Sequence, residues 1–217
     1  MVPVLGRPYL EYQVKWLSSQ DITSILILTG YLGDKIKSYF GDGSSFGVTI
    51  TYSQEPLPLG TAGSLKLAES MLEPYFALIY GDSFLPIGFA KLKEFFLREN
   101  KLGVVVVYDN YSYDTGVLNN IQLDRSGFIL RYEKNSRSPD LNFVEAGVMV
   151  FKKEITDFIP GNKSVSLEED VFPLLINRKE LMGYISKQPF YDIGTKERLR
   201  YFEEVIRSNN FLSLGNK

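Results

Sequence analysis

The stretch VTITYSQEPLPLGTAGSLKLAESMLEPYFALIY, residues 48–80, carries the pattern from which the fold can be predicted. It begins with a short apolar segment (48–53) and ends with another (76–80), and both have the length of a strand. Between them, apolar residues from Leu65 to Leu72 recur at the spacing of one helix face, after the turn LGTAG. A strand, a helix and a second strand in this order are typical of a parallel sheet whose strands alternate with helices.

The same alternation continues on both sides of this stretch. The further predicted elements are a helix near 8–17, a strand at 22–30, a helix near 32–39, a helix near 89–96 and a strand at 104–107. Apolar strands separated by amphipathic helices predict an α/β fold, with a Rossmann-like, mostly parallel sheet covered by helices on both faces.

The pattern changes after residue 108. Strand-like segments with short connections follow at 117–123, 128–132 and 143–151, and they predict an antiparallel lobe beside the sheet. Ser166 and Glu169 have the spacing of a capping box, so a helix is expected to begin there, and a last helix is expected near 199–206. We therefore expect one domain over residues 1–217, with halves at 1–108 and 109–217 and a loose tail at 209–217.

Composition excludes several kinds of chemistry. The 217 residues include no Cys and no His, so disulfides, thiolate nucleophiles, Ser-His-Asp triads and His or Cys zinc sites are ruled out. With 24 basic and 26 acidic residues, the chain lacks the basic excess that binding to nucleic acid needs. No apolar run has the length of a membrane span, and the first residues do not resemble a signal peptide. We expect a cytoplasmic protein with no membrane partner.

The loop LPLGTAGS, residues 57–64, stands between a predicted strand and a predicted helix. Glycines there permit close backbone approach, and amides at a helix start can face a base or a phosphate. The alternative is a tight turn in which Gly60 and Gly63 serve only the geometry.

Two acidic residues follow predicted strands, Asp82 in GDS and Asp192 in YDIGT. Either residue could instead serve only as an ordinary turn or helix-cap residue. As a pair, without His or Cys nearby, they favour a hard cation with oxygen ligands, Mg²⁺ first.

Two further residues are candidates for ligand contact. Lys134 stands just after a predicted strand, and the alternative is a solvated surface lysine. Glu145 lies within an otherwise apolar strand, where a carboxylate is costly unless it is paired or hydrogen-bonded. Sugar hydroxyls would be suitable donors for Glu145, and a structural salt bridge is the alternative.

Taken in order, these segments resemble the sugar-1-phosphate nucleotidyltransferases, also called nucleotide-sugar pyrophosphorylases. The matching stretches are MVPVLGRPYLEYQVKWL, GYLGDKIKSYFGDGSSFGVTITYS, EPLPLGTAGSLKLAE, LIYGDS, EKNS, VEAGVMVF, SLEEDVFPLL and YDIGT. They extend over nearly the whole chain, and SLEEDVFP followed by YDIGT is most similar to mannose-1-phosphate and manno-heptose 1-phosphate guanylyltransferases.

The resemblance implies transfer of a nucleotidyl group from a nucleoside triphosphate, with GTP favoured, to a sugar 1-phosphate. It implies Mg²⁺ as the cofactor, and these two substrates as the partners. The roles it implies are nucleotide binding by Gly60, Thr61, Ala62 and Gly63, catalysis by Asp82, Asp192 and Lys134, with Asp82 and Asp192 also holding the metal, and sugar binding by Gly116, Glu145 and Gly147.

The sequence departs from the family pattern in three places. Asn135 replaces the Pro of Glu-Lys-Pro, which is expected to alter the loop around Lys134, and DTGVLNN differs from the family form around Gly116. Family members also carry a first strand and a GGxGTRL-type loop just before the segment that matches residues 1–4. We expect a truncated enzyme that lacks its first strand. The alternative is a short paralogue that binds a sugar nucleotide, or acts as a regulatory subunit, without catalysis. The sequence does not decide whether the chain forms a homo-oligomer.

Overall fold

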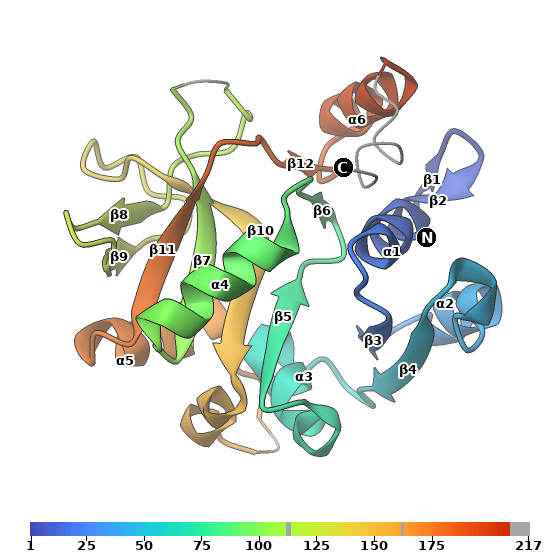
Figure 1. Cartoon of the computed structure of the whole chain (residues 1–217), viewed down its shortest axis with the longest axis horizontal. Helices are drawn as coiled ribbons and strands as arrows, with labels where there is room; N and C mark the ends of the chain where they lie inside the picture. Colours follow the sequence, from blue (N-terminus) through green and yellow to red (C-terminus); the bar gives the residue numbers. More distant parts are fainter. Residues whose placement is uncertain (112–113, 162, 209–217) are drawn as a thin grey trace. The chain divides into compact units, whose positions relative to one another are not determined.

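The computed structural model describes residues 1–111, 114–161 and 163–208, and the predicted loose tail lies outside them (Figure 1). The chain divides into two compact units, the first formed by 1–58 with 191–217 and the second by 59–190. The division expected at residue 108 falls inside the second unit. No helix among the described residues is long and apolar enough to cross a membrane.

The first unit contains a small hairpin, a two-stranded sheet and three α-helices. Its elements are β1 (Pro3–Val4), β2 (Arg7–Pro8), α1 (Tyr9–Ser19), β3 (Ser24–Thr29), α2 (Gly33–Phe40), the short 3₁₀ helix Ser44–Phe46, β4 (Thr49–Gln54), β12 (Tyr191–Asp192) and α6 (Lys196–Ser208). Strands β3 and β4 pair in parallel, as the alternating pattern predicts. The helix predicted for 32–39 is confirmed as α2, and the last predicted helix is confirmed as α6.

A compact apolar cluster holds the first unit together. Val14, Phe40, Val48 and Ile50 are buried, and Ile27 of β3 packs against them. Helix α6 packs on α1 through aromatic rings, with the centroids of Tyr9 and Phe202 4.9 Å apart. Such ring pairs add to the free energy gained by burying apolar area.

The second unit is built around a four-stranded sheet in the order β11-β7-β10-β5. Its elements are α3 (Gly60–Leu67), the 3₁₀ turn Glu69–Met71, β5 (Tyr75–Ile79), β6 (Ser83–Phe84), α4 (Phe89–Glu99), β7 (Gly103–Tyr108), β8 (Ile121–Leu123), β9 (Ile129–Tyr132), β10 (Val144–Lys152), the 3₁₀ helix Lys153–Phe158, the π-helix Leu167–Val171, α5 (Phe172–Asn177) and β11 (Leu181–Ser186).

Strand β10 corrects one expectation. The segment 143–151 was expected in a lobe beside the sheet, but β10 lies between β5 and β7 and runs antiparallel to both. Its run of buried residues explains this position, because an interior strand is covered on both faces. Strands β7 and β11 pair in parallel, so the sheet is mixed. The predicted antiparallel lobe consists of β8 and β9.

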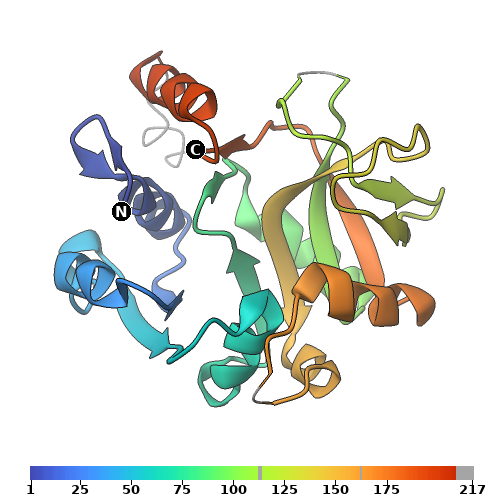
Figure 2. The ribbon, with the colours of Figure 1, turned by 180° about the vertical axis from the view of Figure 1, so that it is seen from behind.

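Helices cover both faces of this sheet, as predicted. Helix α4 crosses one face, where Phe95 packs against Tyr184 of β11 and Phe96 against Tyr75 of β5 (Figure 1). Helix α5 lies across the opposite face, which Figure 2 shows in front. The arrangement is an α/β sandwich of the predicted class.

The start of the helix after residue 165 differs in detail from the predicted capping box. The Glu169 amide donates to Ser166 Oγ at 3.1 Å, as expected, but the Ser166 amide donates to Asp170 Oδ2 at 2.7 Å. The chain forms one π-helical turn there before α5 begins. In this wider turn Asp170, one position after the expected Glu169, accepts the hydrogen bond from the Ser166 amide.

Candidate functional site

The predicted nucleotide turn lies at the first turn of α3, which begins at Gly60. Gly60 has φ +73°, and a Cβ there would lie 2.5 Å from the carbonyl oxygen of Val165. Only glycine suits both conditions. The amides of Ala62 and Gly63 donate to the same Val165 oxygen, at 3.0 and 3.3 Å. Those two amides therefore hold the turn in place and do not face a ligand as we expected. The geometric role considered for Gly60 is confirmed, and nucleotide binding by the turn stays a prediction.

Thr61 connects this turn to a buried carboxylate. Its hydroxyl donates to Glu168 Oε2 at 3.0 Å and accepts the Leu167 amide at 2.8 Å. Glu168 also accepts hydrogen bonds from Ser166 Oγ at 2.9 Å and from the Tyr80 hydroxyl. Burial alone would raise the pKa of Glu168, but these donors outweigh it and hold the pKa below its usual range. Glu168 is therefore an ionised group inside the second unit.

The turn that carries Asp82 depends on Gly147. Gly147 has φ +73°, and a Cβ there would lie 2.4 Å from Ser83 Cβ. The Tyr80 amide donates to the Gly147 carbonyl at 3.0 Å, beside a register shift in β10 between Glu145 and Met149. A side chain at 147 would push the Asp82 turn away from the sheet. This packing role accounts for Gly147, and its predicted contact with sugar stays untested.

Asp82 lies exposed at the end of β5, with Ser83 Oγ 3.4 Å from its Oδ1. Mg²⁺ is commonly held by one or two carboxylates together with substrate phosphates and water. An exposed carboxylate on an anchored turn fits such a ligand. A group of three or more acidic residues able to hold a metal by themselves is not found in residues 1–111, 114–161 and 163–208.

Glu145 is buried in β10 and is only partly satisfied. Its Oε2 accepts the Tyr132 hydroxyl at 2.9 Å, while its Oε1 is buried with no hydrogen-bond partner among the described residues. Burial raises the pKa of Glu145 to about 8, helped by the charges of Glu168 and Asp82 and opposed by Tyr132 and Lys134. The salt-bridge alternative is not seen, because no ion pair within bonding distance joins Glu145 in the described residues.

Lys134 is exposed on the turn that follows β9. Its neighbour Asn135 has φ +61°. Asn tolerates this left-handed conformation, whereas the ring of proline holds φ near about −65°. A proline could not adopt this φ at position 135, and a changed loop around Lys134 relative to the family stays a prediction. The charge of Lys134 acts on Glu145, which places the two side chains in the same region.

Gly116 lies on an exposed loop with φ +71°. Asp114 Oδ1 accepts the Gly116 amide at 2.8 Å, and the side chain of Asn110 accepts from Thr115 and donates to Val117. The loop is therefore held by its own short polar side chains. No contact joins Gly116 to the other predicted residues among the described interactions, so its role in sugar binding stays a prediction.

Asp192 belongs to the first unit, and its position is described only within that unit. Its Oδ1 accepts the Gly194 amide at 2.9 Å, and its Oδ2 accepts Arg198 Nη1 at 2.7 Å. The first bond is the turn chemistry that we considered as the alternative. A metal ion bound by Asp192 through Oδ2 would share that oxygen with Arg198.

In the second unit, Asp82, Lys134 and Glu168 lie near enough to Glu145 for their charges to act on its pKa. Hydrogen bonds through Thr61, Glu168 and Tyr80 connect the 60–63 turn to Gly147. Three residues of this region were not among the predicted ones: Tyr80, Tyr132 and Glu168. Burial raises the pKa of both tyrosines, so they remain protonated donors to the two glutamates. The sequence offered two signals for these residues. Tyr80 and Tyr132 stand at the ends of apolar strand segments, and Glu168 lies in the acidic run after Ser166.

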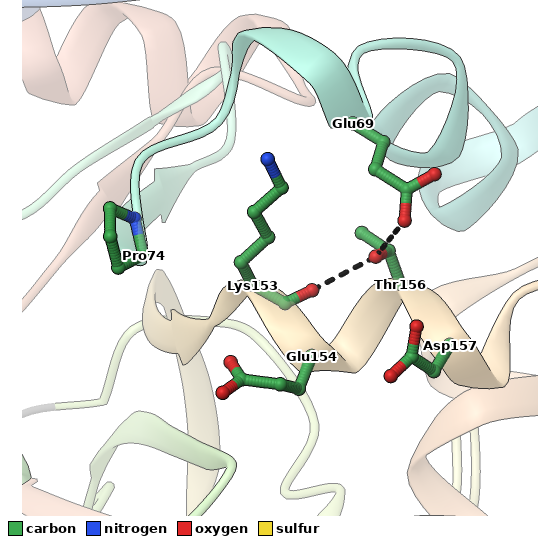
Figure 3. Close-up of a pocket in the computed structure, with 6 residues that line it drawn as sticks. All are labelled: Glu69, Pro74, Lys153, Glu154, Thr156 and Asp157. Carbon is green, nitrogen blue, oxygen red and sulfur yellow. Dashed lines mark hydrogen bonds between the residues drawn. The ribbon is translucent and has the colours of Figure 1, made fainter.

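A pocket of about 300 Å³ lies elsewhere in the second unit and contains none of the predicted site residues. Its lining residues are Glu69, Pro74, Lys153, Glu154, Thr156 and Asp157 (Figure 3). Thr156 donates to Glu69 at 2.5 Å, and Lys66 forms an ion pair with Glu69. Because these polar groups pair with one another, we assign no ligand to this pocket.

The comparisons with known proteins agree with this fold. The family model described as nucleotidyl transferase matches residues 1–208, so the chain belongs to the nucleotidyl transferase family. Its relatives include enzymes that are named as acting on sugar 1-phosphates.

The mannose-1-phosphate guanylyltransferase of Mycobacterium tuberculosis is 28% identical over 91% of this chain and 55% of its own length. The D-glycero-alpha-D-manno-heptose 1-phosphate guanylyltransferase of Aneurinibacillus thermoaerophilus is 27% identical over 95% of this chain and 88% of its own. The chain spans about half the length of several curated relatives that it matches.

Solved structures support the fold. HddC from Yersinia pseudotuberculosis has a TM-score of 0.79 and 23% identity over 95% of this chain and 88% of its own. A putative glucose-1-phosphate thymidylyltransferase from Bacillus anthracis has a TM-score of 0.82 and 22% identity over 96% of this chain and 86% of its own.

Proposed function

We propose that the protein transfers a nucleotidyl group from a nucleoside triphosphate, with GTP favoured, to a sugar 1-phosphate. The product is a nucleoside diphosphate sugar, and pyrophosphate is released. The family match over residues 1–208 carries this proposal, and the guanylyltransferases among the relatives favour GTP. We include in it a cytoplasmic location and a supply of precursors for cell-surface polysaccharide.

The reaction needs no histidine base. A phosphate oxygen of the sugar 1-phosphate attacks the α-phosphorus of the triphosphate, and the bond to the bridging oxygen of the β-phosphate breaks, so that its electron pair leaves with pyrophosphate. A phosphate monoester has a second pKa of about 6, so the attacking group is already ionised at neutral pH. The absence of His and Cys from the chain is compatible with this chemistry.

The chain's own residues would position and neutralise the two anions. Lys134, exposed on its turn, would contact the sugar-linked phosphate with its ammonium group. Glu145, with one oxygen unpartnered, would hydrogen-bond a sugar hydroxyl. The turn at 60–63 would contact the nucleobase and ribose. Mg²⁺, when bound by Asp82, would offset the charge of the phosphates. A metal role for Asp192, which belongs to the first unit, stays a prediction from the sequence.

The test is pyrophosphate release from a panel of nucleoside triphosphates and sugar 1-phosphates, GTP with mannose 1-phosphate first. Asp82→Asn should lower the rate at least about 100-fold, as expected when a group that stabilises transferring phosphates is lost. The matched control is Asp34→Asn, at an exposed position of α2 in the first unit, and it should turn over normally. Near-normal turnover by Asp82→Asn would refute the metal role.

One observation favours the second candidate, a sugar-nucleotide-binding protein without catalysis. Arg198 donates to Asp192 Oδ2, so a metal bound there would have to share this carboxylate with the Arg198 guanidinium. In that case calorimetry would detect binding of a nucleoside diphosphate sugar, while the panel would yield no pyrophosphate. The variant Arg198→Ala tests the effect of Arg198 on metal binding. Without the guanidinium, Asp192 should bind the probe metal Mn²⁺ more tightly.

A further inference from the structure

The turn at 60–63 is held by a segment more than a hundred residues later in the chain. The Val165 amide donates to the Leu59 carbonyl at 2.8 Å, and the Val165 carbonyl accepts the amides of Ala62 and Gly63. Thr61 adds a side-chain link, since it accepts from the Leu167 amide and donates to Glu168. The two segments therefore form one hydrogen-bonded unit.

Helix α3 depends on this support. Its sequence, GTAGSLKL, has only eight residues and contains glycine at 60 and 63. Glycine within a helix costs about 1 kcal/mol relative to alanine, and a helix this short is marginal in water. The conformation of the turn is therefore imposed from outside the helix.

Glu168 is the charged group in this support. It is 6% exposed, and its oxygens accept from Thr61 in α3, Ser166 at the helix start and Tyr80 after β5. Hydrogen bonds to an ionised group are about twice as strong as neutral ones. Loss of the charge would weaken the hold on Thr61 and on Tyr80, which stands two positions before Asp82.

We propose that Glu168 is a positioning residue for the nucleotide: its carboxylate fixes the 60–63 turn through Thr61 and the strand end before Asp82 through Tyr80. Glu168 acts through these residues and does not itself touch substrate. The inference rests on the proposed function, because the nucleotide is what the turn is positioned to bind.

The experiment compares Glu168→Gln with Glu169→Gln, an exposed neighbour on the same helical turn. Hydrogen exchange should be faster at residues 60–67 in Glu168→Gln only. Calorimetry with Mg²⁺-GTP should show an affinity about tenfold weaker, as expected for the loss of charge-assisted hydrogen bonds. Affinity for mannose 1-phosphate should change much less. A purely structural role would lower stability without this difference between the two ligands.

A second pair of variants keeps the proposal testable if Glu168→Gln does not fold. Thr61→Val removes the donor to Glu168 and the acceptor of the Leu167 amide, whereas Thr61→Ser retains the hydroxyl. Faster exchange and weaker GTP binding are expected for Thr61→Val, with both restored in Thr61→Ser.

Unchanged exchange at 60–67 in Glu168→Gln would overturn the inference, and so would faster exchange with unchanged GTP affinity. A wild-type protein that binds no nucleotide would instead refute the proposed function. The exchange measurement would then decide by itself whether Glu168 holds the turn.

Discussion

Glu11 in the first unit and Glu145 in the second are both buried carboxylates, with 5% and 8% of their surface exposed. Glu11 Oε1 accepts from Lys15 at 2.5 Å and Arg7 at 3.3 Å, and its Oε2 accepts from Tyr39 at 2.5 Å. Burial would raise the pKa of Glu11, but these partners hold it below its usual range. Glu145 has a single donor, and burial raises its pKa to about 8.

The two carboxylates differ in how many of their oxygens have a hydrogen-bond partner. Glu11 connects α1 to the hairpin and to α2, and both of its oxygens have partners within the chain. Glu145 keeps a buried oxygen that has no partner in the part of the chain that the structure describes, which costs free energy of folding. Strongly perturbed groups of this kind gather at functional sites. The contrast separates a structural carboxylate from one that we assign to the candidate site.

The largest expected effect concerns the pH dependence of stability at Glu145. Between its ordinary pKa of 4.5 and about 8, the folded state binds the proton more tightly than the unfolded state. The free energy of unfolding should therefore fall as pH rises through this interval, with a slope of up to about 1.4 kcal/mol per pH unit. Glu145→Gln should remove this slope and be more stable than wild type at pH 8.

Urea denaturation followed by circular dichroism between pH 5 and 8.5 measures this slope. The absence of His helps, because few other side chains titrate in the same interval. Equal slopes in wild type and Glu145→Gln would show that Glu145 is ionised throughout, and the contrast with Glu11 would then fail.

The second effect has the opposite sign, at Glu11. Because the pKa of Glu11 is lowered, its contribution to stability is present above about 4.5 and is lost as pH falls. Glu11→Gln should destabilise the protein by about 1–3 kcal/mol at pH 7, since Lys15, Arg7 and Tyr39 lose a charged acceptor. The deficit should shrink at lower pH.

Fluorescence of Trp16, the single tryptophan, reports this unfolding from the same helix α1. Glu204→Gln, at an exposed position of α6, serves as the control and should stay within about 0.5 kcal/mol of wild type. If Glu11→Gln changes the free energy of unfolding no more than the control does, the ion pairs of Glu11 add no net stability.

The smallest expected effects concern the two tyrosines that donate hydrogen bonds to Glu145 and Glu11. Tyr132→Phe removes the donor to Glu145, so the pKa of Glu145 should rise further in a ¹³C carboxyl NMR titration. Tyr39→Phe removes one of several donors to Glu11 and should lower stability at pH 7 by less than Glu11→Gln does. A fall in the pKa of Glu145 in Tyr132→Phe would contradict the hydrogen-bond assignment.

Much of the fold could be predicted from local pattern. The strands at 22–30, 48–53, 76–80 and 104–107 are present within a few residues, whereas the helix expected from Leu65 to Leu72 begins already at Gly60 and ends at Leu67. The position of β10 could not be predicted, because a run of apolar residues does not reveal which strands will flank it. The sequence likewise indicated that Glu145 needs a partner, but left a sugar hydroxyl and a salt bridge as equal alternatives.

Two apolar strands show the same limit. Strand β7, GVVVVY, is buried along its whole length between β10 and β11. Strand β3, SILILT, pairs with β4 in a two-stranded sheet, and most of its residues are half-buried. Periodicity predicts both as strands, whereas the number of neighbours decides how far each is buried.

The sequence by itself determined the alternation of strands and helices, the family resemblance and the exclusion of thiol and imidazole chemistry. Only the tertiary structure decided which carboxylates are satisfied. Ser166 is a local donor to Glu168, but the other donors to Glu145 and Glu168 are Tyr132, Tyr80 and Thr61, which are 13, 88 and 107 positions away in the chain. Hydrogen bonds form only within about 3 Å, so local sequence pattern cannot reveal partners that folding alone brings together.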